Sequence, residues 1–242
     1  MLETGSYYVM YANAFVQAPA DRERFSDLSA YTEGRQEART LYLKGADILN
    51  HGLELRFPGI SEAIKADAMQ VDTSKMAINA FLPQVTKEDS DLIYWDVAAT
   101  LSAFALNPVD IDLNMKIRPL SALIKQVYKV NPDYNNGTLD DFFILFNASV
   151  PAYLGGDAAS VPEYFKKAIE KSGGKMAGPY VSYADSVCIP AGDVAGFKEN
   201  IEKALAINPN ADRSNRLMNL LAQEKARWLL DNAHNLFITW ED

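Results

Sequence analysis

The sequence predicts an all-α fold, and three observations lead to that prediction. Apolar residues recur with the 3.6-residue period of a helix in several segments, a Pro or Gly follows these segments at a constant distance, and no convincing series of strands is found. The chain has 242 residues, 48% of them hydrophobic and 11% aromatic, so it can build a sizeable core. We expect one helical-repeat domain over residues 1–242, arranged as a compact helical array.

Three helical segments share one phase. In each, a Pro or Gly stands five residues after the last packed residue, where it ends the helix. The three sets are Leu120, Ile124, Val127 and Pro132; Val161, Phe165, Ala168 and Gly173; and Phe197, Ile201, Ala204 and Pro209. These offsets match the second helix of a tetratricopeptide repeat. The segments are 41 and 36 residues apart, so the repeats are irregular; unrelated helices of a plain bundle are the alternative.

Each of these segments has a candidate partner helix before it and a signal for its start or end. Ser160 and Glu163 have the spacing of a capping box, and Asp193 precedes the third segment in the N-cap position. The glycine pair in "YLGGD" (153–157) fits a helix C-cap better than a phosphate-binding turn. The candidate partners are residues 91–106, 138–154 and 178–190, of which the last could instead be a strand or irregular.

Residues 215–237 are predicted to form a terminal amphipathic helix along the array. Charged residues such as Glu224, Lys225 and Arg227 occupy one face. The apolar face consists of Leu217, Met218, Leu221, Ala222, Leu229, Ala233, Leu236 and Phe237.

Charge and hydropathy exclude several classes of function. The 23 Lys and Arg against 32 Asp and Glu give a net charge of −9, and no basic run occurs, so nucleic acid and anionic lipid are unattractive partners. Apolar runs such as residues 97–106 are about half the length of a membrane span. The first residues lack a basic region and a cleavage site, so we expect no signal peptide within this chain.

Motifs for catalysis, metal binding or cofactor binding are not found, so we expect a protein that is not an enzyme and has no cofactor. The sequence lacks a phosphate loop, a GxSxG elbow and an HExxH helix, and His51 and His234 lie far apart. Cys188 is the only cysteine, which excludes an internal disulfide, and its apolar context favours a buried structural thiol.

Two carboxylate pairs have structural interpretations. Asp110 and Asp112 are expected to be solvated in a loop. Asp140 and Asp141 fit the first turn of a helix, where negative charge favours the positive end of the dipole.

Aromatic residues are dense on the predicted helices. They are candidates either for core packing or for the lining of an apolar groove or tunnel in the helical array. Asn13 and Gln17 could supply polar groups in that path, or could bridge two helices. The five residues that we select as candidate tunnel-lining, ligand-binding residues are Tyr11, Phe15, Trp95, Phe142 and Phe146.

Five blocks of the sequence, in unchanged order, resemble the TRAP-transporter-associated T component (TatT) family. They are residues 8–20, 38–59, 92–105, 151–187 and 197–230. The resemblance implies divergent tetratricopeptide-like helix pairs and a periplasmic location. It also implies partnership with the periplasmic solute-binding P subunit of a tripartite ATP-independent periplasmic transporter, an internal tunnel, and assembly into a small ring, with a trimer as the first expectation.

The family also has a further N-terminal helix and often a lipoprotein signal. We therefore expect the first helix pair to be incomplete and any lipid anchor to belong to a longer precursor. No catalytic residues come with the resemblance.

Two functions follow from these expectations. The first is a non-enzymatic accessory subunit that exchanges an apolar or amphiphilic solute with the P subunit. The alternative is a peptide-binding scaffold of tetratricopeptide type without a small-molecule ligand. An enclosed aromatic path favours the first function, and an open groove with a polar rim favours the second.

Overall fold

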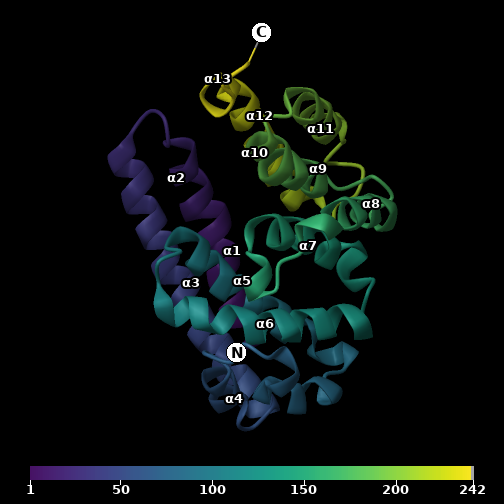
Figure 1. The fold of residues 1–242 in the computed structure, drawn as a ribbon. Coiled ribbons are helices and arrows are strands. Elements are labelled where there is room, and N and C mark those ends of the chain that lie inside the picture. Colours follow the sequence, from purple (N-terminus) through teal and green to yellow (C-terminus); the bar gives the residue numbers. More distant parts are fainter. Residues whose placement is uncertain (241–242) are drawn as a thin grey trace. The chain divides into compact units, whose positions relative to one another are not determined.

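The computed structural model describes residues 1–240, and all regular elements in that range are helices (Figure 1). The all-α prediction is confirmed. The chain comprises two compact units, Met1–Pro132 and Asp133–Asp242. The tetratricopeptide type of the repeat and the single domain remain predictions.

The first unit begins with a helical hairpin. Its first arm is α1 (Leu2–Tyr11), the π-helix η1 (Ala12–Gln17) and α2 (Ala18–Arg22), and its second arm is the long α3 (Leu28–Arg56). Asp27 starts α3, because its carboxylate accepts hydrogen bonds from the backbone N–H groups of Ser29 and Ala30, both at 3.0 Å.

Glycines let the two arms of this hairpin approach closely. A Cβ atom on Gly5 would lie 2.4 Å from Leu49 Cγ, and one on Gly34 would lie 2.5 Å from Ala20 Cβ. The close contact buries Val9 and Ala12 of the first arm in a core with Tyr42 of α3. One face of the first arm therefore packs against α3.

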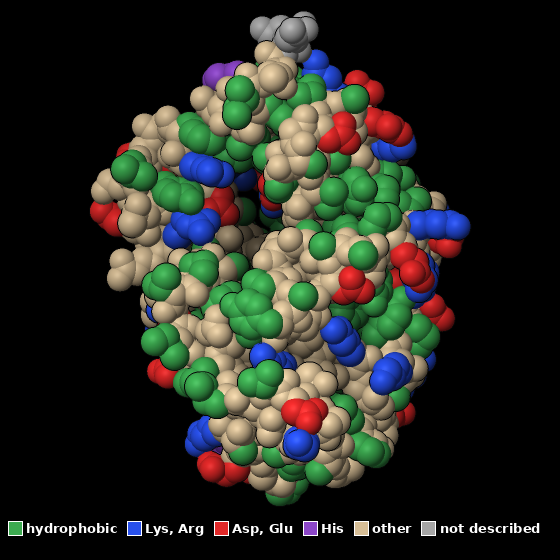
Figure 2. Space-filling model, viewed as in Figure 1, with side chains coloured by type: hydrophobic (Ala, Val, Ile, Leu, Met, Phe, Trp, Pro, Cys, Tyr) green, Lys and Arg blue, Asp and Glu red, His purple; other side chains and the backbone are tan. Residues whose placement is uncertain are grey.

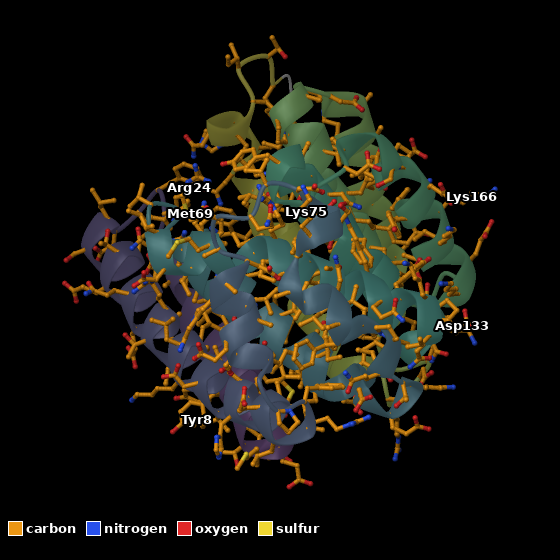
Figure 3. The ribbon with its side chains drawn as sticks, turned by 60° about the horizontal axis from the view of Figure 1, so that its bottom comes forward. Tyr8, Arg24, Met69, Lys75, Asp133 and Lys166 are labelled. Carbon is orange, nitrogen blue, oxygen red and sulfur yellow. The ribbon has the colours of Figure 1, made fainter. Side chains whose placement is uncertain are left out.

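A short helix and a series of 3-10 turns follow. The helix α4 (Ile60–Ala66) leads to η2 (Thr73–Lys75), η3 (Ala77–Ala80), η4 (Leu82–Gln84) and η5 (Lys87–Asp89). The buried carboxylate of Asp67 accepts hydrogen bonds from the backbone N–H groups of Ala77 (2.6 Å) and Ile78 (2.8 Å) and so closes the loop. Met69 and Lys75 of this loop lie at the surface (Figure 3).

The first unit ends with α5 (Ser90–Leu106) and α6 (Ile111–Val130), which pack against each other. The α5 bounds confirm the predicted helix 91–106. The repeat-phase residues Leu120, Ile124 and Val127 are buried on α6, and Pro132 follows the end of that helix by two residues, as predicted.

Asp110 does not behave as a solvated loop residue. Its carboxylate caps α6 by accepting a hydrogen bond from Leu113 N at 3.0 Å, and it also pairs with Arg39 of α3. The prediction for Asp110 was wrong because the Arg39 partner is 71 positions away in the chain. Asp112 is exposed, as expected.

The second unit opens with η6 (Tyr134–Asn136), α7 (Thr138–Ser149), η7 (Ala152–Leu154), η8 (Ala158–Ser160) and α8 (Val161–Lys171). The predicted helix 138–154 ends early, since Pro151 pushes Val150 into an extended conformation. Gly155 has a φ of 108° and caps η7, which agrees with the C-cap interpretation of the glycine pair.

The capping box predicted for α8 is not formed. Ser160 precedes the helix, but its hydroxyl donates to the Asp157 carbonyl at 2.8 Å and accepts from Asn147 Nδ2 at 3.0 Å. Glu163 instead pairs with Lys167 one turn later, at 2.6 Å. The short turn η8 before the helix gives Ser160 helical dihedral angles, so its side chain cannot cap in the usual way.

The segment 178–190 is helical. It consists of α9 (Gly178–Tyr183), the π-helix η9 (Ala184–Cys188) and α10 (Ile189–Ala191), and α11 (Val194–Ala206) follows. Asp193 caps α11 by accepting from Gly196 N at 2.9 Å, as predicted. Cys188 is buried, also as predicted, and burial raises the pKa of its thiol to about 11.

The predicted repeat phase is buried in this unit too. Ala168, Phe197, Ile201 and Ala204 are almost completely inaccessible, and Phe165 is half-buried. Gly173 follows the end of α8 by two residues and has a φ of 59°, and Pro209 follows the end of α11 at Ala206 by three residues. The predicted helix ends are confirmed.

The terminal helices are α12 (Arg216–Asp231) and α13 (Ala233–Leu236). The predicted apolar face is buried toward its C-terminal end, at Leu229, Ala233 and Phe237, but not at its start. Leu217 and Met218 are 57% and 55% exposed, whereas Asn219 and Gln223 are buried. The two amides are buried because each satisfies backbone groups of a neighbouring segment, a role that apolar periodicity does not reveal.

Candidate functional site

Tyr11 and Phe15, two of the predicted lining residues, lie together on the surface of the first unit. Their side chains are 54% and 63% exposed, and their rings stack with centroids 5.6 Å apart. Tyr7 (63% exposed) and Met10 (39%) lie on the preceding turns of the same continuous helix. We call Tyr7, Met10, Tyr11 and Phe15 the aromatic stripe.

The helical segment that carries the aromatic stripe is unusual because it contains no charged residue. Residues 4–20 contain no Asp, Glu, Lys or Arg, although 23% of the chain is charged. On the face shown in Figure 2, side chains of both charges are interspersed among hydrophobic ones. A contiguous exposed apolar patch is typical of an interaction site.

Part of the stripe lies on the π-helix η1, which includes Phe15. The backbone N–H of Ala18 donates to the carbonyl of Asn13, five residues earlier, which is the hydrogen bond of a π-turn. Such turns are frequent at functional sites. A second π-helix, η9, lies in the other unit.

Asn13 and Gln17 bridge helices, which is one of the two roles considered for them. The Tyr42 hydroxyl donates to Gln17 Oε1 at 2.7 Å, Gln17 Nε2 donates to Asp21 at 3.1 Å, and Arg35 donates to Asp21 at 2.6 Å. Burial raises the pKa of Tyr42 to about 12, against the opposing effect of a hydrogen bond with Asn13. These bonds fix η1 to α3 and so hold the backbone under the aromatic stripe.

Trp95 lies on α5 in the first unit and is half-buried. It packs against the core cluster that contains Val9, Ala12 and Tyr42, and its ring meets Tyr94 edge-on at 5.2 Å. This contact is that of a residue at the edge of a core.

Phe142 and Phe146 lie together on α7 in the second unit. Their rings stack at 5.7 Å, and Phe143 meets both rings edge-on. Phe142 is half-buried, whereas Phe146 is only 4% exposed. The five predicted residues therefore form two ring pairs and one separate indole, of which the Tyr11–Phe15 pair is exposed.

The sequence patterns did not predict that carboxyl groups would be buried. Burial raises the pKa of Asp96 on α5 to about 7, only partly offset by Lys116, and burial raises the pKa of Asp141 on α7 to about 6. Asp140, beside it in the first turn of α7 as predicted, is completely buried and pairs with Lys171 at 2.7 Å. The burial of these carboxyl groups depends on tertiary packing, so the local sequence does not predict it.

Residues 1–240 contain neither a candidate metal-binding cluster nor a helix that could span a membrane. That range has no group of three or more His, Cys, Asp or Glu residues placed to hold a metal ion. Across the same residues, every helix is too short or too polar to cross a bilayer.

The fold and this surface define a class of protein: an all-helical protein with an uncharged aromatic face on its first helix. The chain belongs to the TRAP transporter T-component family, whose model matches residues 1–237. It is also 30% identical to a Treponema pallidum (strain Nichols) protein with the name "Uncharacterized protein". That similarity covers 98% of this chain and 72% of the relative. The resemblance to the T-component family is thereby confirmed, and with it a place among transport components.

Proposed function

We propose that this protein is a non-enzymatic accessory subunit of a tripartite ATP-independent periplasmic transport system. It acts in the periplasm, where it binds the solute-binding P subunit and passes an apolar or amphiphilic solute along an internal path. The observation that carries this proposal is the family match over residues 1–237. A trimeric assembly and lipid anchoring belong to the same proposal.

The aromatic stripe supports a binding role. Its exposed rings are held on a helix that is fixed to α3 by the Gln17–Tyr42 hydrogen bond, so little conformational freedom is lost when a partner covers them. Aromatic residues and Met are enriched at protein interfaces. We assign the stripe to binding of the P subunit, with which the solute is exchanged.

The five aromatic residues predicted from the sequence are proposed to contact the solute, Tyr11, Phe15 and Trp95 within the first unit and Phe142 and Phe146 within the second, each unit being considered by itself. Such rings offer a large apolar area to a hydrocarbon chain. The charged head group of an amphiphile would find no polar partner in this set, so it is expected to stay in water while the hydrocarbon chain contacts the rings.

A titration with a fatty acid tests the solute step. Binding is expected to change the tryptophan fluorescence and to raise the melting temperature, because a ligand that binds only the folded state stabilises it by mass action. Phe142→Asp is expected to lose the effect. The control is Leu145→Asp, which places the same charge on α7 at a side chain that is 41% exposed.

If wild type shows neither response at about millimolar fatty acid, where even weak sites fill, the solute step is wrong. Binding of an extended peptide in that case would favour the scaffold function instead.

A further inference from the structure

The second unit carries a surface pocket that is separate from the aromatic residues discussed above. It has a volume of about 440 Å³ and lies where α11, α12, α13 and Trp240 meet. Sites for small molecules commonly have volumes of about 300–1,000 Å³. The pocket is therefore large enough for a compact ligand.

Four of the eight residues that line the pocket are apolar. They are Ile201 and Leu205 from α11, Leu230 from α12, and Trp240; the other four are Lys198, Glu202, Asp231 and His234. Ile201 is 1% exposed and belongs to the core of the unit. Trp240 is held in place by Phe237, which stacks on it at 5.9 Å. A hydrocarbon group can therefore be buried on a preformed surface.

Two carboxylates are among the lining residues of the pocket. Glu202 on α11 and Asp231, the last residue of α12, both line the pocket and are exposed, and neither forms an ion pair within residues 1–240. Asp231 stands at the negative end of the helix dipole, and the last turn of α12 has no basic residue to balance it. Both the carboxylates and the helix end favour a cation in this pocket.

Trp240 already attracts one cation. The ammonium group of Lys198 lies 4.3 Å from the centroid of the indole ring, within the range of a cation–π interaction. The ring thus shows the chemistry that an incoming cation would use. Lys198 also opposes a second positive charge, because it lines the same pocket.

We propose that this pocket binds a small organic cation with a hydrocarbon body, such as an alkylammonium ion. The hydrocarbon lies on Ile201, Leu205, Leu230 and Trp240, and the ammonium group lies between Glu202 and Asp231. This inference goes beyond the proposed function and does not depend on it, since none of the five assigned aromatic residues lines the pocket.

Calorimetric titration of the whole chain with hexyltrimethylammonium tests the proposal, with hexanoate and 1-hexanol as probes that share its alkyl chain. We expect the cation to bind more tightly than 1-hexanol and hexanoate to bind least. Glu202→Gln and Asp231→Asn are each expected to weaken binding of the cation by about 2- to 5-fold, the range for exposed charge pairs.

Two further variants separate a local effect from a change of net charge. Glu199→Gln removes one charge from the same helix, but Glu199 pairs with Lys203 at 2.5 Å and does not line the pocket, so affinity should not change. Lys198→Met should strengthen binding, because it removes the competing cation.

The proposal is overturned if hexanoate binds as tightly as the cation or if the Glu202 and Asp231 variants match Glu199→Gln. Absence of cation binding up to about 10 mM, where a weak site would be populated, would also overturn it.

Discussion

At the scale of single residues, the buried carboxyl group of Asp96 couples stability to pH. Its pKa in the folded protein is about 7, whereas an aspartate in an unfolded chain titrates near 3.9. Between these values the folded state holds a proton that the unfolded state has released, so the free energy of unfolding falls as pH rises through this window. Asp141 adds a dependence of the same sign up to its pKa of about 6.

Asp96→Asn tests this coupling. The neutral amide cannot become charged, so the variant should resemble wild type near pH 4.5 and be more stable than wild type at pH 8. The difference should grow with pH by at most about 1.4 kcal/mol per unit. Urea unfolding at several pH values measures it. Parallel pH profiles for the two proteins would contradict the raised pKa of Asp96, because Asp141 is unchanged in both.

At the scale of elements, the buried amides of α12 join that helix to its neighbours. Gln223 Nε2 donates to the carbonyls of Ala204 (3.0 Å) and Ile207 (2.7 Å) at the end of α11. Asn219 accepts from Ala177 N at 2.8 Å and donates to the Lys175 carbonyl at 2.9 Å. The last carbonyls of a helix need such partners, because no intrahelical donor reaches them.

Gln223→Ala should destabilise the protein by about 1–3 kcal/mol, the cost of leaving buried carbonyls without a donor. Met218→Ala on the same helix is the control, since Met218 is 55% exposed and its truncation should change little. Equal shifts in the midpoint of chemical unfolding would mean that the amide does not hold α11 and α12 together.

Ala204 tests the packing of α11 itself. It is completely buried, so Ala204→Leu should overpack the helix contact and cost about 1–3 kcal/mol. Lys203→Leu, at the exposed neighbouring position, loses only a surface pair with Glu199 and should cost less than about 1 kcal/mol. Indistinguishable thermal melts for the two variants would refute the helical phase assigned to α11.

The same elements show how far the sequence could predict the fold. Helix ends at Pro132, Gly173 and Pro209 were predictable, because a Pro or a left-handed Gly acts locally. The cap at Ser160 was not, since the preceding turn sets the backbone angles. The burial of Leu229 on α12 was predictable from apolar periodicity, but the burial of Asn219 and Gln223 was missed because both are polar by residue type and are buried only through bonds to distant backbone.

The sequence predicted which aromatic residues share a helix face, but not whether that face lies in the core or on the surface. Helical spacing identified Tyr11 and Phe15 as one face, but exposure of that face depends on α3 covering the opposite side through Gly5 and Gly34. Phe146 follows Phe142 by four residues, just as Phe15 follows Tyr11, yet Phe146 is buried and Phe15 is exposed. Aromatic periodicity alone does not distinguish a core from a surface.

At the scale of the whole molecule, the proposed role depends on association. A T component that works with a P subunit needs a stable surface that this subunit recognises, and an uncharged aromatic face in a chain of net charge −9 is suited to recognition by apolar contact. Native mass spectrometry of the full chain should show a trimer. A monomer at all accessible concentrations would exclude that part of the proposal.

The central claim is that the protein binds a P subunit through its aromatic stripe, and interferometry with the P subunit of the same transport system tests it most directly. Wild type should bind, and the double variant Tyr11→Ser with Phe15→Ser should bind at least about tenfold more weakly, as expected for aromatic hot spots. The matched control is Val109→Ser with Ile111→Ser, at side chains 84% and 72% exposed, which should retain wild-type affinity. Equal affinity of the stripe variant and the control, or no binding by wild type, would contradict the claim.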